Sequence, residues 1–163
     1  MTERNIRLFG DPVLKTVSDP IGTIDAGVKG LVDDLVDSVR PPGRAGVAAP
    51  QIGVNLRAFS YNVDGDVGYI INPEIVELSG EPVMMDEGCL SVPGLWFPTL
   101  RYPFARAKGI DVDGNEIEIS GTGVLAQALQ HETDHLNGML YLDRLEKPER
   151  REALKKIRES DWF

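Results

Sequence analysis

The stretch from Gln130 to His135 reads Q-H-E-T-D-H, and it decides how the rest of the chain must be arranged. On a helix, His131 and His135 lie one turn apart on the same face, so both imidazoles reach one cation. Glu132 then lies beside that cation, where it can exchange protons with a water molecule. The alternative is a helix whose two histidines lie on a polar face and match the pattern by chance.

The supply of other ligands supports the metal interpretation. The 163 residues contain two histidines and one cysteine, Cys89, which lies in the stretch E-G-C-L-S. Cys89, His131 and His135 make a set of three ligands, and no cysteine or histidine is left for a closed structural site. Three protein ligands and a position for water are typical of a catalytic metal centre. A carboxylate is an alternative fourth ligand, but Glu132 is better placed as a base.

Composition and charge limit the class of protein. The chain is 42% hydrophobic and 26% charged, as is usual for a soluble globular protein, and its length predicts one domain, residues 1–163. The net charge of -9 argues against direct nucleic-acid binding, which needs a basic surface. The first residues, Met1 to Asn5, carry no apolar signal core, and no apolar stretch is long enough for a membrane span. A single cysteine forms no internal disulfide, so we expect a reducing, cytoplasmic location.

Three helices are predicted from apolar spacing. The first covers residues 25–40 and ends at Pro41-Pro42-Gly43, because neither proline continues a helix. The second covers residues 122–136, carries both histidines, and ends near Asn137-Gly138. The third runs from Pro148 to Ser160, and Trp162 and Phe163 after it either dock on the body or form an exposed patch.

The region between the first two helices is predicted to contain strands. Turn residues such as Asp64-Gly65 and Ser79-Gly80 separate short apolar runs. The expected strands are residues 56–61, 67–72, 75–78 and 82–85, followed by a hairpin of 110–112 and 116–119. A helix, then many strands, then helices indicates the α+β class.

A water molecule activated by the ion is expected to attack a carbonyl carbon. The carbonyl oxygen then becomes an anion, which needs hydrogen-bond donors. The backbone N–H groups that follow Cys89 are candidates, because a bound ligand fixes the neighbouring backbone. Gln51 is another, at the end of the small-residue stretch that begins at Arg44. Small residues let a backbone approach a ligand closely, and the alternative is close packing in the core.

Three stretches together resemble the motif set of peptide deformylases, which is G-x-G-[small apolar]-A-A-x-Q, E-G-C-L-S and Q-H-E-x-D-H. The chain has G-V-A-A-P-Q ending at Gln51, the complete E-G-C-L-S around Cys89, and Q-H-E-T-D-H, in the family's order. The resemblance extends from Asp11 to Leu145. It implies one compact domain of short antiparallel strands around a central metal-binding helix, with an N-terminal and a C-terminal helix.

The resemblance also implies a role for each motif residue. The metal ligands are Cys89, His131 and His135, and the ion is Fe²⁺, replaceable by Zn²⁺, Ni²⁺ or Co²⁺. Glu132 is the general base, and the Gln51 side chain and the Leu90 backbone N–H stabilise the oxyanion. The residues that hold the peptide backbone are Ala45, Gly46 and Gly88. The substrate is the N-formyl group on the initiator methionine of nascent peptides, near the ribosome exit, and the products are formate and a free N-terminus.

Some positions depart from the family pattern or allow two interpretations. Arg44 stands where the family has glycine, and Val47 where leucine is common, so peptide preference is open. Arg44 either alters access to the site or turns outward. Glu87 and Arg101 form either a buried pair that orients a ligand loop or separate surface charges. Asp134 either binds a ligand imidazole or faces water.

Two other functions compete with deformylation. An H-E-x-x-H metallopeptidase needs a third ligand downstream, whereas Cys89 lies upstream of the helix. A non-catalytic metal-binding relative that acts as a binding module has no need of Glu132 or Gln51. Both residues are present in this chain.

Overall fold

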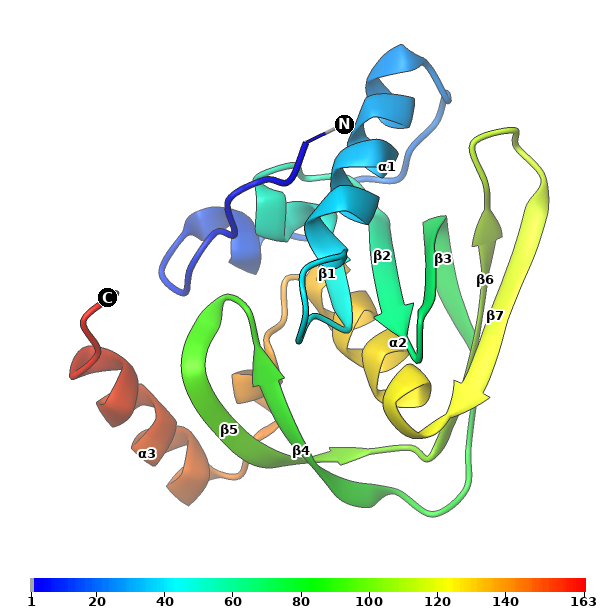
Figure 1. Ribbon diagram of the computed structural model, residues 1–163. Helices are drawn as coiled ribbons and strands as arrows, with labels where there is room; N and C mark the ends of the chain where they lie inside the picture. The colour runs from blue at the N-terminus through cyan, green and yellow to red at the C-terminus, as the bar shows by residue number, and fades with distance from the viewer. Residues whose placement is uncertain (1) are drawn as a thin grey trace.

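The helix that carries both histidines, α2 (Gly123–Leu136), lies at the centre of the computed structural model, which describes residues 2–163 (Figure 1). Thr122 precedes it in an extended conformation as the N-cap, and Asn137 caps its end. Most of its side chains are buried, and these include Gln130, His131 and Glu132. A helix that buries polar groups must find partners for them on the surrounding elements.

A five-stranded antiparallel sheet supplies one side of those surroundings. Its order is β1-β2-β3-β6-β7. The strands are β1 (Gly46–Ala48), β2 (Ala58–Val63), β3 (Asp66–Ser79), β6 (Phe104–Ile110) and β7 (Glu116–Thr122). Phe59 and Ile70 pack with α2, whereas their neighbours Ala58 and Ile71 pack with α1 (Ala26–Val39). Because successive side chains of a strand alternate, α1 and α2 cover opposite faces of the sheet.

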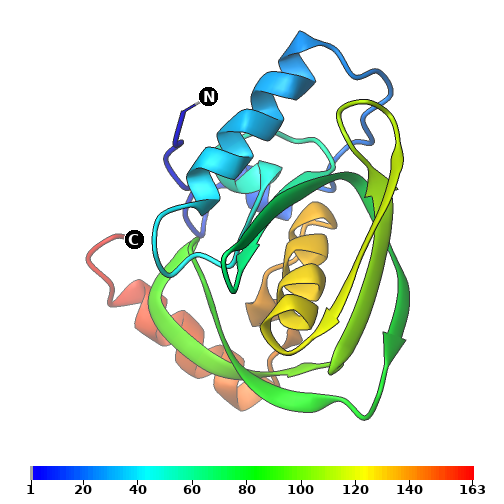
Figure 2. The same ribbon diagram turned by 45° about the vertical axis from the view of Figure 1, so that its right-hand side comes forward.

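A separate hairpin of β4 (Val83–Cys89) and β5 (Val92–Arg101) encloses α2 from another side, as Figure 2 shows. Phe97 of β5 belongs to a second cluster with Tyr141, Ala153 and Ile157. This cluster packs α3 (Lys147–Arg158) and the 3-10 turn η3 (Tyr141–Arg144) on the hairpin. Two more 3-10 turns are η1 (Pro12–Lys15) and η2 (Ala49–Ile52).

The helix predictions and the α+β class are confirmed, but several strand predictions are wrong. Residues 67–72 and 75–78 form one strand, β3, in which Asn72 adopts a φ of 51° and binds the backbone N–H and carbonyl of Ile21. The predicted strand 110–112 retains only Ile110. The Asp111 carboxylate accepts from the N–H of Asp113 and of Asn115, which makes this segment the turn.

Two strands, β5 and β6, were not predicted from the sequence. β5 contains Pro93, Gly94 and Pro98, which usually interrupt a strand, and the buried positions of β6 are Ala105 and Ala107, a residue type that favours strands only weakly. The predicted strand 82–85 is the beginning of β4, which continues to Cys89. Among residues 2–163, no helix is long and apolar enough to cross a membrane.

Replacing Leu35 with alanine tests the packing of α1 on the sheet. Leu35 is fully buried, and removal of a buried leucine side chain leaves a cavity, so we expect the free energy of unfolding to fall by about 2–5 kcal/mol. Val17 is 61% exposed, and Val17→Ala is the control, with an expected change within about 0.5 kcal/mol. Urea denaturation measures both. Equal losses in the two variants would contradict this description of the core.

Candidate metal centre

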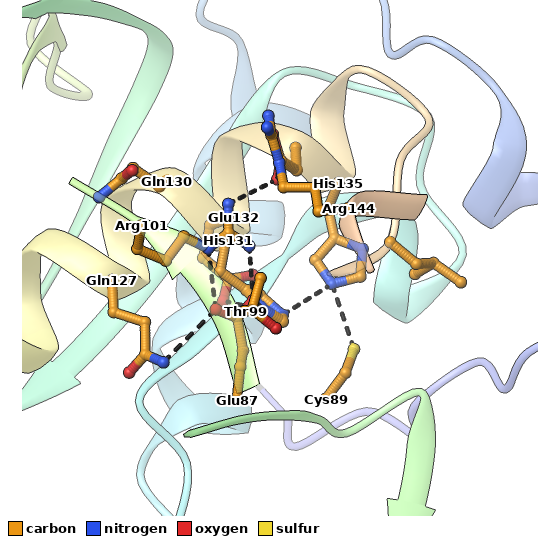
Figure 3. Close-up of polar contacts among 12 residues, drawn as sticks. Glu87, Cys89, Thr99, Arg101, Gln127, Gln130, His131, Glu132, His135 and Arg144 are labelled. Atoms are coloured by element: carbon orange, nitrogen blue, oxygen red, sulfur yellow. Dashed lines mark hydrogen bonds and ion pairs between the residues drawn. The ribbon is translucent and has the colours of Figure 1, made fainter. Parts of the chain in front are cut away.

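Three potential metal ligands converge from two elements. Cys89 ends β4, while His131 and His135 lie one turn apart on α2, and Figure 3 shows the three side chains pointing toward one another. His135 Nε2 lies 3.4 Å from Cys89 Sγ and 3.2 Å from His131 Nε2. All three ligand atoms lie within 4.8 Å of one another.

These separations match the donor set of a tetrahedral ion. Metal–nitrogen bonds of about 2.1 Å and metal–sulfur bonds of about 2.3 Å give tetrahedral edges of about 3.3–3.6 Å. The observed 3.2 and 3.4 Å are close to those edges. Burial and the neighbouring His131 lower the pKa of His135 well below its usual value, so His135 offers a neutral lone pair. The three residues therefore fit a divalent cation.

Glu87 fixes the orientation of His131. Its Oε2 lies 2.6 Å from His131 Nδ1, so the ring donates that N–H and leaves Nε2 free to bind an ion. Burial would raise the pKa of Glu87, but hydrogen bonds from Arg101 and His131 outweigh it and hold the pKa at about 2. Glu87 is therefore a carboxylate throughout the neutral range.

Arg101 links this carboxylate to the rest of α2. Its Nε and Nη2 donate to the two oxygens of Glu87 at 2.8 and 2.5 Å, and its Nη1 donates to Asp134 at 2.9 Å. Arg144 donates to both oxygens of Asp134 at 2.6 and 2.7 Å. Arg101 is 2% exposed, so the buried-pair interpretation is confirmed and that of a surface charge is wrong. Both predictions for Asp134 are also wrong, because its carboxylate is buried away from the surface and binds Arg101 and Arg144 instead of a ligand imidazole.

Glu132 lies beside the three potential ligands, where its side chain is buried closely against Gly46. Its Oε2 is 3.9 Å from His131 Nε2, and burial raises its pKa to about 7. Glu132 Oε1 is buried and has no hydrogen-bond partner within residues 2–163. A β-carbon on Gly46 would lie 2.6 Å from Glu132 Oε2, so only glycine lets β1 pass this close to the carboxyl group.

Gln51 is held in one orientation by three contacts. Its Oε1 accepts from the Ala48 N–H at 3.0 Å, and its Nε2 donates to Ser91 Oγ at 3.2 Å and lies 3.7 Å from Cys89 Sγ. The N-terminal segment contacts the two motifs that end at Gln51 and at Ser91. The backbone N–H of Arg7 donates to Gln51 O, and that of Phe9 donates to Ser91 O. No role for Ser91 was predicted from the sequence, although it is the last residue of E-G-C-L-S.

A cavity of about 260 Å³ opens next to these groups. Most of the predicted site residues border it, namely Ala45, Gly46, Gln51, Gly88, Cys89, Leu90, His131 and Glu132. Arg44 also borders the cavity, and its Nη1 donates to Ser38 O at 2.6 Å near the end of α1. Val47 lies fully buried in the core between α1 and the sheet. The structure thus brings all the predicted residues into one region.

Comparison with known proteins identifies the family. The family model for polypeptide deformylase matches residues 3–151. The chain belongs to the polypeptide deformylase family. A peptide deformylase from Parafrankia sp. is 50% identical, with coverage of 99% of this chain and 89% of that protein. One from Acidothermus cellulolyticus is 47% identical, with coverage of 99% and 89%.

Solved structures agree with this assignment. A peptide deformylase from Legionella pneumophila has a TM-score of 0.90 and 37% identity and covers 97% of this chain and 95% of its own. The deformylase from Ehrlichia chaffeensis in complex with actinonin has a TM-score of 0.89 and 36% identity, covering 99% of both chains. The resemblance found in the three motifs, the compact antiparallel fold and the class of a metal-dependent peptide deformylase are confirmed.

Replacing Cys89 with serine tests the metal centre of this deformylase. A neutral hydroxyl is a poor substitute for an anionic sulfur, so we expect the variant to lose its metal during dialysis that the parent survives. Loss from both proteins should accelerate as the pH falls, because protons compete with the ion for its ligands. Elemental analysis after dialysis measures retention, and Ser60→Ala, which removes a buried hydroxyl elsewhere, is the control. A Cys89→Ser variant that keeps its metal as tightly as the parent would exclude Cys89 as a ligand.

Proposed function

We propose that this chain removes the formyl group from N-formyl-methionyl peptides by hydrolysis, at an ion held by Cys89, His131 and His135. The main support for this proposal is that these three donors converge beside Glu132 and Gln51 at the edge of one cavity. The third donor lies upstream of the helix, on β4, as the three-motif pattern requires. One domain, residues 1–163, carries the activity.

The peptide backbone binds between β1 and β4. β1 is an edge strand of the five-stranded sheet, and Ala45 and Gly46 border the cavity there. Gly88 borders it from β4. An extended peptide adds to a free strand edge through main-chain hydrogen bonds, which hold any sequence in the same register. This mode suits an enzyme that must accept many different nascent chains.

Proton transfer is the task of Glu132. When bound, a divalent ion supplies a water nucleophile at neutral pH and polarises the carbonyl under attack. Glu132 takes the proton of the attacking water and later delivers it to the leaving amine nitrogen, which releases formate and a free N-terminus. Its buried position supports this role, because a carboxyl group with a pKa near the working pH serves well as base and then as acid.

The formyl oxygen becomes anionic as the water adds, and two donors stabilise it. The Gln51 Nε2 directs one N–H to Ser91 Oγ and lies 3.7 Å from Cys89 Sγ, so its second N–H lies beside the ion site, where the oxyanion replaces the sulfur as its acceptor. The Leu90 backbone N–H is the second donor, next to the ligand Cys89. Donors fixed before the reaction cost no reorganisation when the charge develops, and this explains why Gln51 is held at both ends of its amide.

The metal in the cell is Fe²⁺, as the resemblance to the family implies, and Zn²⁺, Ni²⁺ or Co²⁺ can replace it, because a donor set of this type accepts several divalent ions. The substrates are nascent chains near the ribosome exit, and the location is the cytoplasm, where a single cysteine stays reduced.

Anaerobic purification followed by metal analysis and a formate-release assay with formyl-Met-Ala-Ser tests the whole proposal. Fragmentation of the unformylated peptide, without release of formate, would instead indicate a metallopeptidase.

Glu132→Gln distinguishes the role of the general base from that of the metal ligands. The amide cannot accept the water proton, whereas all three ligands remain, so we expect normal metal content with a turnover lower by about 100- to 10,000-fold. Formate release and elemental analysis on one sample measure both quantities. A loss of less than about tenfold would rule out general-base catalysis by this residue.

Ser91→Ala tests how Gln51 is positioned. We expect Gln51→Ala to lower kcat by about 100- to 1,000-fold, with metal content unchanged. Ser91→Ala should lower kcat by a smaller factor in the parent and have no further effect in the Gln51→Ala background, because Ser91 acts through the Gln51 amide. Ser60→Ala is the control for a buried serine and should act equally in both backgrounds. Equal effects of Ser91→Ala in both backgrounds would show that Ser91 is only structural.

A further inference from the structure

One face of the β4–β5 hairpin is apolar although it lies in solvent. Met84 pairs with Leu100, and Asp86 pairs with Pro98. Cross-strand partners point to the same side of a sheet, and Trp96 lies two residues before Pro98 on that side. The exposed fractions are 67% for Trp96, 59% for Met84 and 51% for Leu100. We call Met84, Trp96, Pro98 and Leu100 the apolar strip.

The opposite face of the hairpin already makes the contacts that the fold needs. Glu87, Phe97, Thr99 and Arg101 are buried on that side. An antiparallel pair with one buried face normally has a polar outer face. Here Asp86 is the only charged residue of β4 and β5 on the outer face between Met84 and Leu100. Exposed apolar residues that gather in this way mark a surface where another chain binds.

The apolar strip is continuous with the cavity of the metal centre. Trp96 borders the cavity together with Gly88 and Asp86. The Trp96 ring lies so close to Gly88 that a β-carbon there would come within 2.9 Å of it. From Trp96 the strip runs away from the cavity to Leu100, a rise of about 13 Å along the strand. This length corresponds to about four residues of an extended peptide.

We propose that the apolar strip binds the part of the substrate chain that follows formyl-methionine and favours apolar side chains there. The inference rests on the proposed function. A cavity of about 260 Å³ takes the end of a polypeptide and not its continuation, so the following residues must leave across the rim. The rim at Trp96 leads directly onto the strip. The substrate chain is therefore the occupant that the position of the strip favours.

Two sets of formylated peptides of equal length test the proposal. Both begin with formyl-Met-Ala and continue for four residues, which are Leu and Val in one set and Ser and Gly in the other. For the parent we expect a KM about three- to tenfold lower with the apolar set, the factor that partial burial of one or two apolar side chains produces. Adding residues beyond these four should give no further gain.

The double variant Met84→Ser/Leu100→Ser should abolish this preference. Neither residue borders the cavity, so the hydrolysis of formyl-Met-Ala itself should stay unchanged. Val76→Ser/Leu78→Ser is the matched control, because these residues are 40% and 39% exposed on β3 and should leave the preference intact. Fluorescence anisotropy of labelled peptides bound to the Glu132→Gln protein measures the same preference without turnover.

Each contrary result is distinct. A preference that survives in Met84→Ser/Leu100→Ser would overturn the proposal, as would equal losses for both peptide sets. A concentration-dependent dimer that this variant abolishes, with peptide preference unchanged, would assign the strip to a second copy of the chain. If the parent releases no formate from formyl-Met-Ala, the proposed function fails, and the anisotropy comparison still decides whether the strip binds apolar peptides.

Discussion

The rest of the site depends on the hydrogen bonds that the Glu87 carboxylate accepts. It accepts hydrogen bonds from Arg101 of β5 and from His131 of α2, and all three groups are buried. Loss of Arg101 would leave this buried carboxylate with the His131 ring as its remaining partner in the pair, and breaking a buried ion pair costs about 3–5 kcal/mol. The hairpin that supplies Cys89 therefore also sets the ring orientation of His131 on α2. Through Asp134, the same arginine joins this pair to Arg144, so the end of α2 is held from two directions.

The two faces of the β4–β5 hairpin differ in what they contact. The inner face lies against the candidate metal centre, and the outer face carries the apolar strip. Its inner face carries Glu87 and Cys89, which are both buried, and Glu87 orients the His131 ring. Its outer face carries the apolar strip and borders the cavity at Trp96. Because the faces alternate along each strand, a change of outer residue leaves the inner residues in place. Substrate contacts can thus differ between chains that share one set of ligands.

Local patterns predicted the parts of this structure that local physics decides. The apolar spacing of residues 25–40 and 122–136 is a property of each helix alone, and both helices form as expected. The partners of Asp134 depend on where β5 and η3 lie in space, and neither position follows from spacing along the chain. The role of Ser91 was hidden for the same reason, because its partner Gln51 is 40 residues away. The motifs identified the family and the three residues that could hold an ion, while the contacts that orient these residues required the folded chain.

The wall of the cavity originates in an irregularity of pairing that no local pattern reveals. Glu87 pairs with Phe97, but Cys89 pairs with Val92, so the register shifts and residues 93–96 lie outside the regular ladder. All four of these residues border the cavity. A bulge of this kind redirects side chains beside active sites, and here elements from the end of the chain support it. Trp162 Nε1 donates to Pro93 O and Tyr141 Oη to Leu95 O, so the packing of the C-terminal segment on β5 shapes a cavity to which it contributes no lining residue.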